Sequence, residues 1–224
     1  MHRRLEFALI YLAGPAVGWV LIRLQPHAVI PLLLVGGLVA LTILARDPAF
    51  ARQEWGWNGS TRSVITRVLV VWALVAVGLV TWALLAVPEY FLRFPTEHPR
   101  RWLALLALYP ILSALPQEIL FRTLFFHRYG ALFPGPQWRI AANSLVFGWA
   151  HIVMGNLPCL VATALLGLLL AVTYERFRSL LVVTLEHALY GCLVFSLGLG
   201  LYFVPRERTA EMTSPPPPPH IHTQ

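Results

Sequence analysis

The stretch Pro116-Gln117-Glu118-Ile119-Leu120-Phe121-Arg122 places an amide, an acid and a guanidinium close together in a chain that is otherwise mostly apolar. A carboxylate and an arginine at membrane depth are costly, so such groups usually face a cavity or pair with one another. On a helix, Glu118 and Arg122 lie on one face with the acid first, which is the favourable order. His151 and His187 also fall inside apolar stretches. These residues are therefore the candidates for one polar site inside the membrane.

The composition indicates an integral membrane protein. Of the 224 residues, 58% are hydrophobic and 12% are charged, whereas a soluble domain is usually about a quarter charged. We therefore expect an all-α polytopic bundle of about seven or eight transmembrane helices. The formal net charge is +7, and every basic residue is arginine. Arginines in the loops suit anionic lipid head groups, and we expect no nucleic acid partner.

Hydropathy predicts where the helices lie. A transmembrane helix needs about 20 apolar residues, and the runs that meet this need are 6–23, 28–45, 65–87, 101–115, 138–155, 158–174 and 179–203. An amphipathic helix at 117–129 is expected after the fourth run, with a kink or restart at Pro116, and it would be an eighth span if it crosses the membrane. Cys159 and Cys192 lie in apolar runs, so we expect buried thiols and no disulfide.

These runs imply three regions. Residues 1–100 are expected to form N-terminal membrane helices with interfacial loops, and 101–203 the helical core that carries the candidate site. Residues 204–224 contain five consecutive prolines and are expected to be a disordered tail. The distribution of arginines between loops predicts a cytoplasmic N-terminus. The composition is typical of a bacterial protein, so we expect the cytoplasmic (inner) membrane.

Glu118 and the two histidines could together support hydrolysis. A carboxylate can take a proton from water, and imidazoles can orient that water, hold a metal or stabilise an oxyanion. Glu118, His151 and His187 belong to different helices of one bundle, so the spacing permits convergence without establishing it. His127 and Asn143 are also polar, but they lack motif support and we expect structural roles for them. Glu186 precedes His187 directly, and because adjacent helix residues point about 100° apart it need not serve the same site.

The motifs resemble a known family. Gln117-Glu118-x-x-x-Arg122, then Phe147-x-x-x-His151, then His187 is similar to the CPBP family of CAAX proteases and bacteriocin-processing enzymes, also called Abi. The family pattern is Glu-Glu-x-x-x-Arg, Phe-x-x-x-His and His-x-x-x-Asn on successive membrane helices, and the resemblance covers roughly 101–203.

The resemblance implies an intramembrane endopeptidase that acts on a membrane-associated protein or peptide substrate in the lipid bilayer. Its catalytic residues would be Glu118, His151, His187, Gln117 and Arg122. The resemblance leaves open a zinc-dependent mechanism, with the metal on Glu118, His151 and His187, and a metal-free glutamate mechanism. Because the composition is bacterial, we expect no prenyl group on the substrate.

Two positions depart from the family pattern. Gln117 replaces the first Glu, and an amide cannot accept a proton at neutral pH. Gly191 replaces the last Asn, so one proposed oxyanion donor is absent. Glu118 could serve as the base while Gln117 positions water, or the chain could be a weak or specialised peptidase, or it could bind a membrane substrate without cleaving it.

Two other classes of protein stay open. The departures favour a non-catalytic membrane binding, immunity or assembly factor, in which Glu118 and Arg122 form only a structural ion pair. Intramembrane Glu and His residues also occur in proton-coupled transporters, although the chain shows no internal repeat of the kind that many transporters have.

Overall fold

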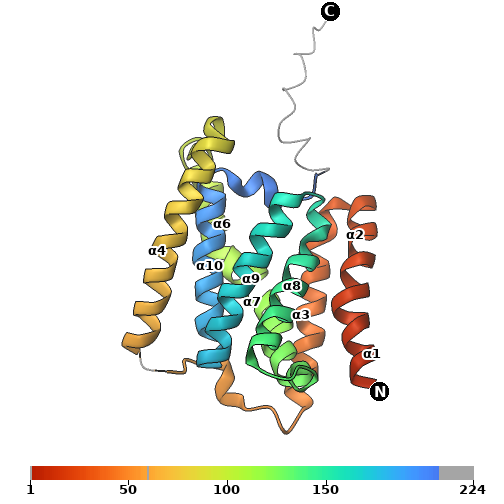
Figure 1. Ribbon diagram of the computed structural model, residues 1–224. Coiled ribbons are helices and arrows are strands. Elements are labelled where there is room, and N and C mark those ends of the chain that lie inside the picture. Colours follow the sequence, from red (N-terminus) through yellow and green to blue (C-terminus); the bar gives the residue numbers. More distant parts are fainter. Residues whose placement is uncertain (1, 60, 207–224) are drawn as a thin grey trace, which may run out of the picture.

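Apolar helices account for nearly all regular structure in the computed structural model, which describes residues 2–59 and 61–206 (Figure 1). No strand occurs in these residues, and five helical stretches are long and apolar enough to cross a membrane. The expected all-α polytopic membrane bundle is therefore confirmed. The five stretches are His2–Leu24, Pro26–Arg46, Thr61–Ala86, Pro99–Leu132 and Leu157–Phe177.

The helices follow one another with short connections. The first stretch comprises α1 (His2–Ala8), η1 (Leu9–Ala13) and α2 (Gly14–Leu24), and the next three long helices are α3 (Val29–Arg46), α4 (Thr61–Ala86) and, after the short α5 (Arg93–Glu97), α6 (Pro99–Tyr109). The last three long helices are α8 (Pro136–Ala150), α9 (Leu157–Phe177) and α10 (Leu180–Ser196). Short 3-10 turns occupy Pro26–Ala28, Arg52–Trp55, Pro88–Tyr90, Gly130–Leu132, His151–Met154 and Leu199–Phe203.

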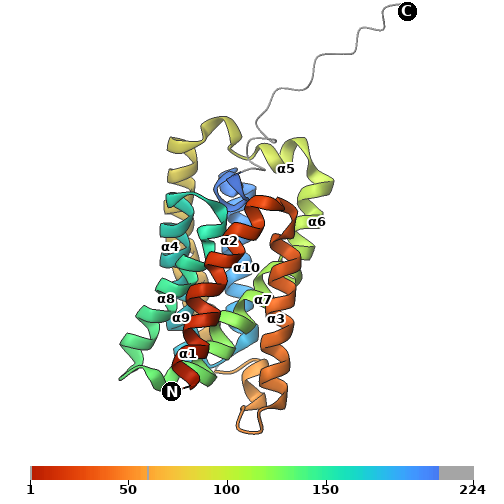
Figure 2. The ribbon, with the colours of Figure 1, turned by 90° about the vertical axis from the view of Figure 1, so that its right-hand side faces the viewer.

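The expected separate helix at 117–129 is wrong, because the chain stays helical from Pro99 to Leu132. After α6 the backbone continues as π-helix η5 (Pro110–Ala114), α7 (Leu115–Glu118) and π-helix η6 (Ile119–Tyr129). Proline lacks a backbone N–H and usually breaks the i→i−4 ladder. Here the wider π turns carry the helix past Pro110 and Pro116, so no restart occurs. Figures 1 and 2 show α7 in the centre of the bundle, next to α3 and α10.

The outer surface of the bundle is apolar. Large side chains stay exposed along several helices, such as Leu85 at 80% on α4 and Leu38 at 63% on α3. Hydrocarbon chains are as apolar as leucine, so such faces are stable against lipid. Cys159 is buried, Cys192 is partly buried and both thiols are free, as expected. The chain is therefore an integral membrane protein whose polar residues at membrane depth turn inward.

Ion pairs and hydrogen bonds hold the loops at the end where the N-terminus lies (Figure 1). Arg128 donates two hydrogen bonds of 2.9 Å to the Glu6 carboxylate. His127 Nε2 lies 2.9 Å from Asp47 Oδ2, and this hydrogen bond lowers the pKa of Asp47. His127 therefore has the structural position that the sequence indicates. The tail beyond residue 206, with its run of prolines, lies outside the described residues.

Gly37→Ala is expected to destabilise the bundle, whereas Gly78→Ala is not. A Cβ at Gly37 would lie 2.6 Å from Pro116 Cβ, so α3 would have to move from α7 at a cost of about 1–3 kcal/mol. At Gly78 on α4, no described atom lies within 4 Å of the added Cβ, and alanine favours a helix by about 0.5–1 kcal/mol. Thermal unfolding in detergent micelles measures both variants. Equal melting temperatures would contradict this packing.

Candidate active site

The junction between α7 and η6 carries the central ion pair. Glu118 ends α7, and Arg122 lies in the first turn of η6. Glu118 Oε2 lies 3.3 Å from Arg122 Nε, and both side chains are 0% exposed. Two further hydrogen bonds hold this part of the helix, because the Tyr11 hydroxyl donates to the Leu120 carbonyl and the Asn143 amide donates to the Phe121 carbonyl. Side chains from the N-terminal segment η1 and from α8 therefore hold the part of the helix that carries the pair.

The second oxygen of Glu118 contacts the candidate histidine on α10. His187 Nδ1 lies 2.7 Å from Glu118 Oε1, and His187 is 2% exposed. A carboxylate can only accept, so His187 donates from Nδ1–H and a neutral ring keeps its lone pair on Nε2. The structure thus brings together Glu118, Arg122 and His187, with one carboxylate shared between a guanidinium and an imidazole.

His151 lies beside this group without joining the hydrogen bonds. Its Nδ1 is 2.8 Å from the Phe147 carbonyl, which can only accept, so a neutral His151 also keeps its lone pair on Nε2. The Phe147 ring centroid lies 4.9 Å from that of His151 and 5.8 Å from that of His187. Arg122 Cζ lies 4.5 Å from the same ring centroid. Phe147 therefore packs against His151, as expected, and also contacts the His187 ring and the Arg122 guanidinium.

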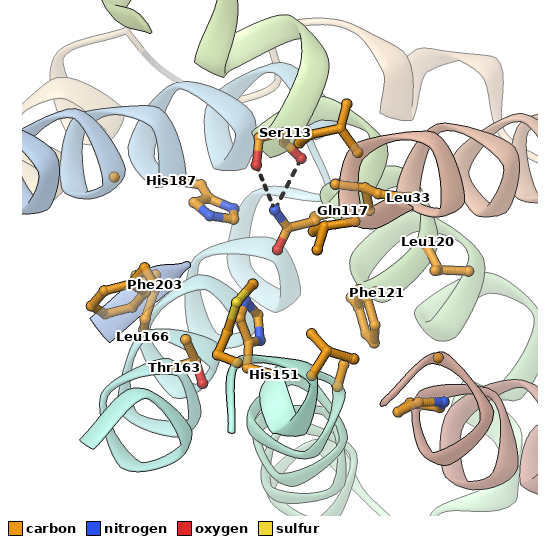
Figure 3. Close-up of a pocket in the computed structure, with 18 of the residues that line it drawn as sticks. Leu33, Ser113, Gln117, Leu120, Phe121, His151, Thr163, Leu166, His187 and Phe203 are labelled. Carbon is orange, nitrogen blue, oxygen red and sulfur yellow. Dashed lines mark hydrogen bonds between the residues drawn. The ribbon is translucent and has the colours of Figure 1, made fainter. Parts of the chain in front are cut away.

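A large cavity borders the site. Its volume is about 1510 Å³, and its lining includes Gln117, His151 and His187 but neither Glu118 nor Arg122 (Figure 3). Most other lining residues are apolar. Val39 on α3 and Leu165 on α9 line the cavity and are 54% and 61% exposed. The cavity therefore opens between helices onto the lipid-facing surface.

Gln117 presents its amide oxygen to this cavity. Its Nε2 donates to the Ser113 carbonyl at 3.1 Å and lies 3.0 Å from the Ser113 hydroxyl, which leaves Oε1 pointing away from Ser113 (Figure 3). An amide oxygen accepts a hydrogen bond from water but takes no proton. Of the two adjacent residues, Gln117 thus lines the cavity with its amide, whereas the Glu118 carboxylate does not line it.

The donors expected for zinc do not form a metal site in this arrangement. Across residues 2–59 and 61–206, no group of three or more His, Cys, Asp or Glu side chains converges well enough to hold a metal. The Nδ1 of His187 and one oxygen of Glu118 bond to each other, and the second oxygen pairs with Arg122. A tetrahedral zinc site needs these atoms turned toward a common point.

Two polar residues outside the motifs adjoin the site. Tyr109 ends α6, and its hydroxyl lies 3.2 Å from His187 Nε2. Ser113 accepts from Gln117 as described. Sequence reasoning missed both, because they precede the motif on a stretch that reads as a plain apolar helix. Their spacing of four and eight residues before Gln117 is the only signal, since it puts them near one face.

Glu186 does not join the site, although it precedes His187 in the sequence. The side chain is 0% exposed, and neither carboxylate oxygen has a hydrogen-bond partner among the described residues. Adjacent helix residues point about 100° apart, which directs Glu186 away from Glu118. The Asn143 side-chain amide donates a hydrogen bond to the backbone carbonyl of Phe121. The position of Glu186 is compatible with the expectation that it need not serve the same site as His187, and Asn143 makes a backbone contact of the kind expected for a structural residue.

The part of the chain that carries these residues is similar to a known protein family. A family model described as "Type II CAAX prenyl endopeptidase Rce1-like" matches residues 99–193. These residues form an Rce1-like CAAX endopeptidase domain. The resemblance to the CAAX protease family is therefore confirmed, and the match contains α6 to η6, α8, α9 and most of α10. Neither the curated proteins nor the solved structures yielded a significant match to the chain.

The Rce1-like match fits the geometry in one respect. Every residue that contacts Glu118, His151 or His187 in the hydrogen bonds above lies within 99–193. The family is a family of membrane proteases, and residues 99–193 are similar to it.

Glu118→Gln and Arg122→Met are each expected to destabilise the protein by about 3–5 kcal/mol, because either change leaves a buried charge without its partner. The double variant Glu118→Gln/Arg122→Met removes both charges. It should cost about 1–3 kcal/mol less than the sum of the single changes. Thermal or denaturant unfolding in micelles measures the coupling. Additive effects would show that the two side chains do not interact.

Proposed function

We propose that the chain is an intramembrane endopeptidase that hydrolyses a peptide bond of a membrane-associated protein or peptide. The observation that carries this proposal is the Glu118–His187 hydrogen bond of 2.7 Å behind a cavity that His187 lines. A carboxylate that holds an imidazole by Nδ1–H directs the basic Nε2 outward, and this pair activates nucleophiles in unrelated hydrolases.

In this mechanism His187 is the general base. Its Nε2 takes one proton from a water molecule, and the water oxygen forms a bond to the substrate carbonyl carbon while the carbonyl oxygen becomes an oxyanion. The proton on Nε2 then passes to the peptide nitrogen, the C–N bond breaks, and the amine leaves. The second hydrogen of the water is donated to Gln117 Oε1 or to the free Nε2 of His151, and this hydrogen bond fixes the position of the water.

Glu118 acts through His187 and not on water. It is 0% exposed and does not line the cavity, so it positions the imidazole and stabilises the imidazolium. Arg122 pairs with the second carboxylate oxygen at 3.3 Å and so helps to hold Glu118 in place. The resting group carries one negative and one positive charge. The proton gained by His187 then coincides with the negative oxyanion, so the net charge of the site stays near zero.

The substrate is held in the membrane. The cavity is mainly apolar and opens to the lipid-facing surface, so it suits a peptide that carries an apolar membrane-embedded portion. The Rce1-like family name refers to prenylated substrates. For this chain we propose a non-prenylated protein or peptide of the bacterial cytoplasmic membrane, with the N-terminus of the enzyme in the cytoplasm.

The role of Gln117 favours one alternative. Gln117 lines the cavity with an amide, whereas the carboxylates of Glu118 and Glu186 do not line it, so the same fold could bind a membrane protein without cleaving it, as an immunity or assembly factor does. The two functions differ in one observable, which is whether new protein termini appear.

N-terminal profiling of membrane proteins from cells of the source organism tests the proposal. Cells carry the natural protein, Glu118→Ala or His187→Ala at matched abundance. Termini that depend on the natural protein should fall by roughly 10³-fold in both variants. Glu186→Gln is the matched control, because it removes a buried carboxylate that does not adjoin the cavity, and it should retain cleavage.

Two results would refute the assignment. Identical profiles in all cells would show that the chain is not a peptidase, and full cleavage by Glu118→Ala would show that Glu118 does not position the base. If the single variants fail to accumulate, Glu118→Gln/Arg122→Met replaces them, since it buries no unpaired charge.

Chelators are expected to leave cleavage unchanged, because the proposed mechanism uses no metal. The purified full-length protein is incubated with EDTA or 1,10-phenanthroline, and the rate is then measured on the substrate identified by profiling. Loss of activity that added zinc restores would instead support the zinc-dependent alternative on Glu118, His151 and His187.

A further inference from the structure

Tyr109 places a phenol hydroxyl against the proposed base. Its oxygen lies 3.2 Å from His187 Nε2, and the residue lines the cavity. The neutral imidazole that donates to Glu118 has only a lone pair on Nε2, so the Tyr109 hydroxyl is the donor in this hydrogen bond. His187 Nε2 thus accepts a hydrogen bond from the hydroxyl of Tyr109, a residue that lines the cavity.

Gly191 makes room for this phenol. It lies on α10 one turn after His187, and a Cβ built there would overlap the Tyr109 ring and its hydroxyl oxygen. The Tyr109 ring also packs against Phe195, with centroids 5.7 Å apart, and against the His187 ring at 6.0 Å. His187, Gly191 and Phe195 of α10 therefore form a surface against which the Tyr109 ring packs. The ring fits there only because residue 191 has no side chain.

The helix that carries Tyr109 continues through a π turn toward the cavity. Tyr109 is the last residue of α6, and Pro110 begins the π-helix η5. The same helical stretch then carries Ser113 and Gln117 into the cavity. The hydroxyl of Tyr109 and the amide of Gln117 are thus presented by one helix to one space, opposite His187 on α10.

We propose that the Tyr109 hydroxyl is the oxyanion donor of this site. The inference rests on the proposed peptidase function. Because Nε2 has a single lone pair, the Tyr109 hydroxyl turns its hydrogen away from Nε2 as that atom takes the proton of water. The negative oxygen of the tetrahedral intermediate forms beside it at that moment. Protonation of His187 therefore releases the Tyr109 hydrogen when the oxyanion needs a donor, and no proton is transferred from the phenol.

The geometry explains why a donor is needed from this direction. The Gln117 Nε2 hydrogens are used by Ser113, and His151 Nδ1–H is used by the Phe147 carbonyl. Tyr109 is then the side chain at the base whose hydrogen becomes free during the reaction. One oxyanion donor contributes roughly 10²–10³-fold to the rate.

Steady-state kinetics of the purified full-length protein tests the inference, with the substrate identified by profiling. Tyr109→Phe keeps the ring and removes the hydroxyl, so kcat should fall roughly 10²–10³-fold while KM changes little. Tyr202→Phe is the matched control, because Tyr202 stacks on Trp82 with centroids 5.2 Å apart and does not line the cavity. It should keep the natural kcat.

A second variant tests the Tyr109 hydroxyl by moving it instead of removing it. Gly191→Ala displaces the phenol without removing it, so kcat should also fall at least tenfold. Nitrogen-15 NMR of ring-labelled histidine supplies a readout that does not depend on turnover. The Nε2 resonance of His187 should shift in Tyr109→Phe and stay unchanged in Tyr202→Phe, since only the first variant loses a hydrogen bond to that atom.

The outcomes separate this inference from the proposed function. A natural protein that cleaves nothing refutes the peptidase function, and the inference falls with it. Cleavage with an unchanged kcat in Tyr109→Phe, or a rise in KM alone, overturns the Tyr109 assignment and leaves the peptidase function intact. An unchanged His187 Nε2 resonance in Tyr109→Phe also overturns it, because the hydrogen bond would then be absent.

Discussion

The shared carboxylate of Glu118 is the interaction on which the site depends. One oxygen lies 2.7 Å from the His187 imidazole and the other 3.3 Å from the Arg122 guanidinium, and all three side chains are almost completely buried. Isolated charges in such surroundings would cost several kcal/mol each. Because the carboxylate neutralises the guanidinium and also holds the neutral imidazole, the bundle tolerates these groups and fixes His187 in one tautomer.

The backbone around this carboxylate is unusual because it must deliver several side chains to one place. The helical stretch from Pro99 to Leu132 contains two internal prolines, Pro110 and Pro116, and two π-helical segments. Tyr11 and Asn143 donate to carbonyls of the second π segment. A π turn changes the angular position of every later side chain, so this stretch presents Gln117 to the cavity while it directs Glu118 into the interior.

The cavity and the buried ion pair divide the chemistry between two environments. The apolar cavity opens toward lipid and suits a membrane-held chain, whereas the charged groups lie behind its wall. His187 connects the two, since its Nδ1 contacts the carboxylate and its Nε2 meets Tyr109, which lines the cavity. This division permits a carboxylate at membrane depth to influence a reaction without contact with the substrate.

The sequence alone determined the class of structure and the identity of the chemical groups. Long apolar runs permit only helices in a bilayer, and the spacing of Glu118 and Arg122 is sufficient to predict that they share a helical face. The Rce1-like match covers residues 99–193, which contain these motifs. Only the tertiary structure decided that the stretch stays one helix through Pro116, that Glu118 bonds to His187 while His151 stays apart, and that Tyr109 lies over Gly191. These facts depend on how separate helices rotate and pack, because the contacts join residues about 70 to 80 positions apart and residue spacing fixes directions only within one helix.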